Sequence, residues 1–239
     1  MDHLMNKGTL WLIPSMLGDT PADRVIPAYN IMVIGTLKIF IVEEIRTARR
    51  FLKKCIPEIN IGELEFLVFN EHSDTVDLSP FIEPLMNGKD VGLLSEAGIP
   101  CIADPGSEIV KASHEHQIVV KPLTGPSSLF LALMASGFNG QNFAFHGYLP
   151  VDKKLRKKSL RELEKAIYAN DQTQLFIETP YRNRQLVESI LETCMDSTLL
   201  CIANLLTDNN EEIVTRSIRE WRKNIPDLNK KPSIFLLYR

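Results

Sequence analysis

The chain has 239 residues, of which 44% are hydrophobic and 24% are charged, and these proportions exclude a disordered or collagen-like protein. Its formal net charge of −3 excludes a general attraction to polyanions, so any binding of nucleic acid must come from a local basic patch. The four cysteines lie far apart without a CxxC pair, and no apolar run reaches the ~20 residues that cross a bilayer. We therefore expect a reduced cytoplasmic protein with no metal site, disulfide or membrane segment.

Short β-branched or aromatic runs alternate with amphipathic helical patterns in the first half of the chain. The expected strands are 9–13, 38–43, 65–69, 91–95 and 118–121, and the expected helices lie near 27–37, 46–54, 78–87 and 107–116. Such alternation predicts βαβ units and an open, mainly parallel sheet. We assign residues 1–121 to this N-terminal α/β domain.

A turn of sequence KPLTGPSS begins the second half, and its two serines can cap the apolar helix that follows. The expected strands are then 142–147, 174–178, 198–204, 211–217 and 233–238, with helices that start at Lys153 and Pro180. The polar segment LLTDNN, between the third and fourth of these strands, is typical of a turn in an antiparallel pair and predicts a mixed sheet. Residues 122–239 are thus expected to form a second α/β domain.

The stretch VGLLSEAGIPCIADPGSEIV, residues 91–110, combines a buried strand, a loop rich in Gly and Pro, and the start of a helix. Gly98 and Gly106 allow close backbone approach or a positive φ, and Ser107 is placed to cap the helix. Ligands of open α/β sheets bind beyond the carboxyl ends of the strands, so the loop is a candidate backbone cradle. Because the chain has neither a GxGxxG nor a Walker A motif, the pattern favours a ligand without phosphate, such as S-adenosylmethionine. The alternative is an ordinary strand-to-helix loop in which Asp104 and Ser107 are turn and cap residues.

Six segments of the sequence carry a resemblance to a known family. They are PSMLGD (14–19), EEIRTARRFL (43–52), LLSEAGIPCIADPGSEIV (93–110), PLTGPSSLFLALMASGF (122–138), FHGYLP (145–150) and FIETPYR (176–182). In this order they resemble the tetrapyrrole methylase superfamily, and most closely its ribosomal RNA small-subunit methyltransferase I branch. The resemblance implies two α/β domains, S-adenosylmethionine bound in a cleft between them, and a homodimer. The cofactor-binding positions that it implies are Pro14, Ser95, Glu96, Ala97, Ser127, Ser128 and Ala203.

Methyl transfer to a ribose hydroxyl benefits from a general base, and carboxylates at strand ends are the candidates. Glu44 and Glu178 lie at the ends of predicted strands, and we predict a catalytic role for them. Arg46 and Arg182 can pair with these carboxylates or with a substrate phosphate. A surface ion pair or a helix cap is the alternative for each glutamate. His72, which follows the third strand, is either a site residue or a solvated loop histidine.

A basic cluster after FHGYLP includes Lys153, Lys154 and Arg156. Such a cluster can bind phosphates and would give salt-dependent RNA binding in an otherwise acidic protein. The alternative is a solvated helix face.

These features together predict an S-adenosylmethionine-dependent methyltransferase whose acceptor is the ribose 2′-oxygen of small-subunit ribosomal RNA. Two segments depart from the branch: EEIR (43–46) stands where it has Glu-Asp-Thr-Arg, and NLLTD (204–208) stands where it has Arg-Glu-Leu-Thr-Lys. The departures leave two alternatives open. One is a methyltransferase that acts on a tetrapyrrole or another small molecule, and the other is a non-catalytic paralogue that binds the cofactor.

Overall fold

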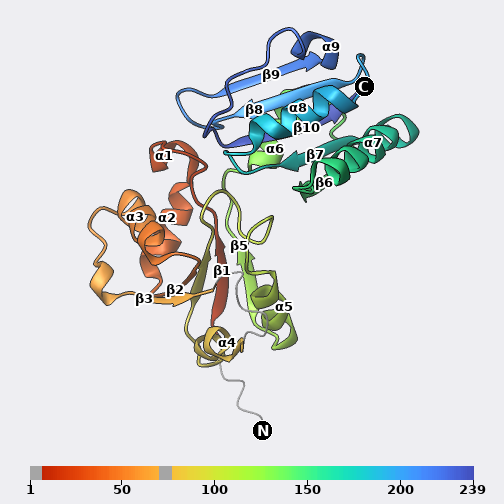
Figure 1. The fold of residues 1–239 in the computed structure, drawn as a ribbon. Helices are drawn as coiled ribbons and strands as arrows, with labels where there is room; N and C mark the ends of the chain where they lie inside the picture. Colours follow the sequence, from red (N-terminus) through yellow and green to blue (C-terminus); the bar gives the residue numbers. More distant parts are fainter. Residues whose placement is uncertain (1–6, 70–76) are drawn as a thin grey trace. The chain divides into compact units, whose positions relative to one another are not determined.

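In the computed structural model, which describes residues 7–69 and 77–239, the first half of the chain forms a five-stranded parallel sheet (Figure 1). The strands lie in the order β3-β2-β4-β1-β5. All five match predicted strands: β1 (Thr9–Ile13), β2 (Ile39–Val42), β3 (Glu65–Val68), β4 (Val91–Leu94) and β5 (Val119–Pro122). The connection that leaves β1 runs toward β2, and the connection that leaves β4 runs the opposite way toward β5. The strand order therefore reverses between the neighbours β1 and β4.

Helices cover both faces of this sheet because successive side chains of a strand point to opposite sides. Phe40 and Val42 of β2 belong to a core shared with α1, α2 and α3, whereas Ile39 and Ile41 belong to a core shared with α4 and α5. The helices are α1 (Ala22–Val25), α2 (Ala28–Thr36), α3 (Ile45–Cys55), α4 (Ser79–Met86) and α5 (Ser107–Glu115), with a 3₁₀ turn η1 at Ile61–Glu63. The four longer helices confirm the prediction, whereas α1 and η1 are too short to show a periodic pattern.

The second half of the chain forms a mixed sheet of order β6-β7-β10-β8-β9. Its strands are β6 (Phe143–Tyr148), β7 (Thr173–Ile177), β8 (Leu199–Asn204), β9 (Glu212–Ser217) and β10 (Ser233–Tyr238). Only β6 and β7 are parallel neighbours. The predicted antiparallel pairing of β8 with β9 is confirmed, with Leu199 opposite Ser217.

Both faces of the second sheet are also covered. The helices are α6 (Ser128–Ser136), α7 (Lys153–Asn170), α8 (Asn183–Thr193) and α9 (Ile218–Trp221). On one face α7, α8 and α9 pack around Phe176 and Phe235, which are fully buried and stacked. On the other face lies α6, where the Thr215 hydroxyl donates to the Ser136 carbonyl oxygen (2.9 Å).

The chain divides into two compact units, residues 1–127 and 128–239, a few residues after the expected boundary between 121 and 122. The turn after β5 belongs to the first unit because its backbone is hydrogen-bonded there. The Leu123 amide donates to the Leu12 carbonyl oxygen (2.9 Å), and the Asn30 side chain donates to the Thr124 carbonyl oxygen (2.7 Å).

Candidate functional site

The loops after β1 and β4 meet at the carboxyl edge of the parallel sheet, where the strand order reverses. The Ser95 amide donates to the Ile13 carbonyl oxygen (3.2 Å), and the Ser15 amide donates to the Gly98 carbonyl oxygen (2.8 Å). Open α/β sheets bind their ligands at this position. The structure thus brings together the predicted segments that contain Pro14 and Ser95.

The turn before α6 reaches the same edge. Its Gly125 lies against the ring of Pro14, so closely that a Cβ atom there would be 2.2 Å from Cγ of the proline. Ser127, a predicted cofactor residue, is buried at the end of this turn, whereas Ser128 opens α6 in the second unit. Three of the segments named by the resemblance are therefore neighbours within the first unit.

The loop after β4 has an unusual backbone. Gly98 (φ +83°), Cys101 (φ +67°), Ala103 (φ +54°) and Gly106 (φ +118°) all have a positive φ. The two glycines adopt it without strain, as predicted, but at Cys101 and Ala103 such a conformation costs about 1–3 kcal/mol each. Residues held in this way concentrate at ligand sites. The expected cap is wrong in one detail: Gly106, not Ser107, is the N-cap of α5.

Two buried hydroxyl groups at this edge lack a hydrogen-bond partner among the residues that the structure describes. Ser15 and Ser95 are 3% and 2% exposed, yet neither hydroxyl oxygen has a hydrogen-bond partner within the described part of the chain. A buried hydroxyl without a hydrogen bond costs about 1–3 kcal/mol. Both serines line a recess of about 20 Å³, which holds one water-sized group. Ser15 was not among the predicted positions, although it belongs to the segment PSMLGD and lies two residues after the end of β1.

Glu44 and Glu96 line the same recess but differ in their proton affinity. Glu44 is the N-cap of α3: its carboxylate accepts from the amides of Arg46 (2.8 Å) and Thr47 (2.6 Å), and these bonds lower its pKa. Glu96 is exposed, but partial desolvation of its carboxyl group, and to a lesser extent repulsion by Glu43 and Glu44, raise its pKa. Glu96 is therefore the stronger base of the two, and Glu44 has the helix-cap role that the sequence also allowed. The next residue, Ala97, is exposed.

The predicted base of the second unit is already paired. Glu178 and Arg182 form an ion pair of 2.6 Å in the loop between β7 and α8. Glu178 is buried, and its carboxylate also accepts from the Thr179 amide (2.7 Å).

The predicted cofactor residue Ala203 lies in β8, and its side chain is buried inside the sheet.

The cations predicted to bind substrate have different surroundings. Arg46 is exposed on α3, and Lys154 is exposed on α7. Lys153 lies 3.1 Å from a carboxylate oxygen of Glu192. Arg156 is buried and hydrogen-bonded within its own unit, so its guanidinium is not at the surface.

Residue His72 lies in the segment 70–76, outside the described residues. Within residues 7–69 and 77–239, no group of three His, Cys, Asp or Glu side chains is arranged to hold a metal ion. In the same ranges no helix combines the length and the apolar character needed to cross a membrane.

A solved structure shares this fold. The crystal structure of the methyltransferase CobJ superimposes with a TM-score of 0.62 at 17% sequence identity, over 98% of this chain and 94% of that chain. The arrangement of a parallel and a mixed sheet is thus one that a methyltransferase adopts.

The sequence comparisons assign the family. Residues 34–221 match the model of the tetrapyrrole (corrin/porphyrin) methylases. The chain belongs to this family and is a methyltransferase, which confirms the resemblance.

Curated relatives named ribosomal RNA small subunit methyltransferase I match most of the chain. The Bacillus subtilis protein is 32% identical over 217 residues, which are 90% of this chain and 69% of the relative. The Buchnera aphidicola protein is 28% identical over 240 residues, 99% of this chain and 80% of the relative. The Vibrio cholerae protein is 28% identical over 204 residues, 85% of this chain and 67% of the relative.

Proposed function

We propose that this methyltransferase uses S-adenosylmethionine to methylate a ribose 2′-hydroxyl of small-subunit ribosomal RNA. The relatives' names support the RNA acceptor and do not favour the tetrapyrrole alternative. The choice of the 2′-oxygen as the methylated atom rests on the resemblance to the ribosomal RNA small-subunit methyltransferase I branch. The assignment of the cofactor rests on the strained loop after β4 and on the buried hydroxyls of Ser15 and Ser95, which have no hydrogen-bond partner within the described residues.

The recess at this edge is large enough for one small group of a ligand, and its lining favours a polar or positively charged group over a phosphate oxygen. Its lining within the described residues includes Glu44 and Glu96 but no Lys or Arg. Carboxylates repel a phosphate and attract a positive group. When bound, S-adenosylmethionine supplies an activated methyl group on a positively charged sulfonium. Ser15 and Ser95 would hold it through their hydroxyls, and the backbone of the loop after β4 would line it.

Catalysis of methyl transfer depends mainly on orientation, and a general base assists when the acceptor is a hydroxyl. We assign the base to Glu96, because its raised pKa makes it a better proton acceptor than Glu44. Glu178 is the second candidate, although Arg182 already holds its carboxylate. In the proposed step the acceptor hydroxyl passes its proton to the Glu96 carboxylate.

The cofactor is tested by titration calorimetry with S-adenosylmethionine. Replacing both Ser15 and Ser95 by Ala should weaken binding by roughly 10-fold, since each lost hydrogen bond contributes about 0.5–1.5 kcal/mol. The exposed Ser107→Ala is the matched control and should bind as the wild type does. No binding at millimolar cofactor by the wild type would refute the cofactor assignment.

The acceptor is tested with radiolabelled cofactor and small ribosomal subunits from a strain that lacks this protein. We expect label on a single ribose 2′-oxygen of the RNA. Cofactor binding without label in any RNA fraction would refute the RNA acceptor but leave the cofactor site intact.

We further propose a cytoplasmic homodimer. Phe130 and Met134 are 56% and 78% exposed on one side of α6, and Phe143 packs edge-on against Phe130. Exposed apolar patches of this kind are commonly covered by a partner. A ribosomal acceptor and four free cysteines agree with a reducing cytoplasm. Sedimentation that shows only a monomer at micromolar concentration would refute the dimer.

A further inference from the structure

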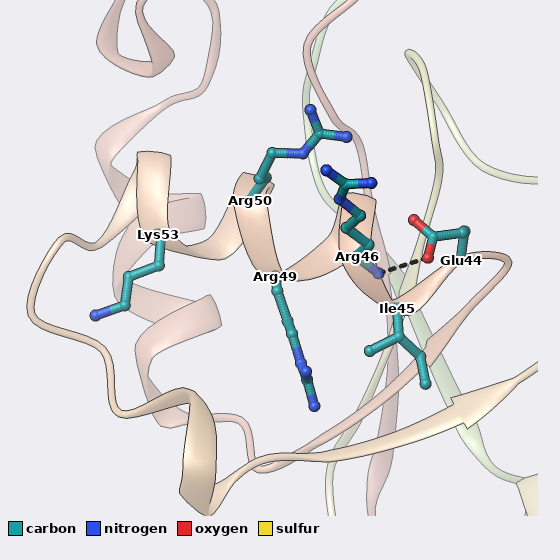
Figure 2. A pocket seen from close by; sticks show the side chains of 6 residues that line it. All are labelled: Glu44, Ile45, Arg46, Arg49, Arg50 and Lys53. Carbon is teal, nitrogen blue, oxygen red and sulfur yellow. Dashed lines mark hydrogen bonds between the residues drawn. The ribbon is translucent and has the colours of Figure 1, made fainter.

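The exposed face of α3 carries four cations that form no ion pair within the described part of the chain. They line an open hollow of about 490 Å³ (Figure 2). None of them forms an ion pair within residues 7–69 and 77–239, whereas Lys54 on the same helix pairs with Asp19 (2.6 Å). The exposed cations without an ion pair are Arg46, Arg49, Arg50 and Lys53.

These four side chains form two rows. Figure 2 shows the side chains of Arg46 and Arg50 pointing toward one edge of this face and those of Arg49 and Lys53 pointing toward the other edge. Within each row the two cations are four residues apart, so they are neighbours on the helix surface and repel each other. The guanidinium of Arg49 lies 5.4 Å from the ring centroid of Phe66, an arrangement that restricts its orientation.

The basic cluster of α7 has a different environment. Lys153 and Lys157 share the carboxylate of Glu192, at 3.1 and 2.7 Å. Arg156 is 4% exposed. Lys153, Arg156 and Lys157 of α7 are therefore engaged within the second unit, whereas the four cations named on α3 are exposed.

We propose that α3 binds the phosphate backbone of the RNA acceptor through Arg46, Arg49, Arg50 and Lys53. This inference rests on the proposed function. Two cations four residues apart are separated by about 6 Å along a helix, a spacing comparable to that of successive phosphates in a single strand. Guanidinium groups match phosphate oxygens in bidentate geometry, and a chain with net charge −3 needs such a local patch to bind RNA.

The position of α3 links this surface to the proposed reaction. Glu44, the N-cap of α3, lines both the hollow with the four cations and the recess with Ser15, Ser95 and Glu96. An RNA strand held on α3 would therefore pass beside the recess. The four cations would act as positioning residues for the acceptor ribose.

The test uses the full chain and a fluorescein-labelled fragment of small-subunit ribosomal RNA, with binding followed by anisotropy at several salt concentrations. The first variant carries Arg49→Gln, Arg50→Gln and Lys53→Gln. Each phosphate contact with a single strand contributes about 0.7 to the slope of log K against log salt. We expect the slope to fall by about 2 and the affinity to fall by about 10-fold or more near 0.1 M salt.

Two matched variants separate charge from structure. Replacing Arg49 and Arg50 by Lys keeps every charge and should keep the salt slope. The variant with Lys154→Gln, Lys158→Gln and Arg161→Gln removes three charges from α7 and should change the slope much less. Calorimetry with S-adenosylmethionine and thermal melting are recorded for each variant.

The outcomes are distinct. Wild-type affinity and slope in the α3 glutamine variant, or an equal loss in the α7 variant, would overturn the inference and leave the proposed function standing. An equal loss in the Lys variant would overturn it as well, because the loss would then not follow charge. A wild-type protein that binds the cofactor but no RNA would overturn both this inference and the RNA acceptor.

Discussion

Replacing Arg156 by Met should destabilise the second unit and leave RNA binding almost unchanged. The Arg156 guanidinium donates from Nε to the Ser189 hydroxyl oxygen (3.1 Å), and from Nη1 to the carbonyl oxygens of Val151 (2.8 Å) and Pro150 (3.3 Å). These bonds tie the start of α7 to α8 and to the turn before α7. Arg156 thus supports the fold, although its residue type and neighbours in the sequence indicate phosphate binding.

The size of the effect follows from these contacts. A hydrogen bond from a charged donor contributes about 1.5–3 kcal/mol, and removal of the donor leaves three acceptors without their partner. The desolvation of the buried charge offsets part of this contribution. Met keeps the apolar stem of the side chain, so little packing is lost. We expect the free energy of unfolding to fall by about 2–4 kcal/mol.

The assay is urea denaturation followed by tryptophan fluorescence. Trp221 reports on the second unit, because it is 3% exposed and its indole Nε1 donates to the Leu200 carbonyl oxygen (2.9 Å). The Trp11→Phe background removes the signal of the first unit. The exposed Lys154→Met is the control and should change the free energy of unfolding by less than about 0.5 kcal/mol. An unchanged urea midpoint for Arg156→Met, combined with weakened RNA binding, would refute the structural role.

Three further changes test the first unit. Gly106→Ala should lower the free energy of unfolding of the first unit by about 2–3 kcal/mol and weaken cofactor binding. The reason is that φ is +118° at this position and the new Cβ would lie 2.6 Å from Leu93 Cδ2. Trp11 fluorescence measures the stability, and calorimetry measures the cofactor binding. Ser95→Ala should preserve or raise stability, since it removes an unpaired hydroxyl, but weaken cofactor binding by several-fold, and equal binding would contradict the cradle. Glu96→Gln should lower turnover by about 100-fold or more. Because the pKa of Glu96 is raised in the folded state, its charge opposes folding above that pKa, and the penalty disappears as the pH falls. The variant should therefore be more stable than the wild type at neutral pH, and the rise of wild-type activity with pH through the Glu96 pKa should be absent from its profile.

Most of the fold was predictable because the strands are short apolar runs and the longer helices show periodic patterns. The unpredicted helix α9 had a usable signal. Ser217 and Glu220 form a capping box, and the Ser-x-x-Glu pattern is visible in the sequence. The turn after β5 belongs to the first unit because of hydrogen bonds to β1 and α2, which composition does not reveal.

The candidate site was predictable only in part, because some of its features follow from the positions of residues along the chain and others depend on the folded surroundings. The family resemblance named Pro14 and Ser95, and their position at one edge was predictable because each directly follows a strand of a parallel sheet. The unpaired state of Ser15 and Ser95 depends on every neighbour that the fold brings close, so no local pattern encodes it. Similarly, the raised pKa of Glu96 depends on its desolvation and on nearby carboxylates, whereas the cap role of Glu44 is local and was one of the two predicted alternatives.

The two basic helices show why charge density alone does not locate a phosphate-binding surface. The sequence around Lys153 is the denser in Lys and Arg, yet its counter-ion Glu192 comes from α8, far along the chain. Arg46, Arg49, Arg50 and Lys53 of α3 form no ion pair within the described residues. Arg49 is oriented by the ring of Phe66 instead. Binding a polyanion requires cations whose charge is not already satisfied, since exchange of one partner for another gains little. In an acidic protein the number of unpaired cations on one face is therefore the relevant quantity, and it favours α3.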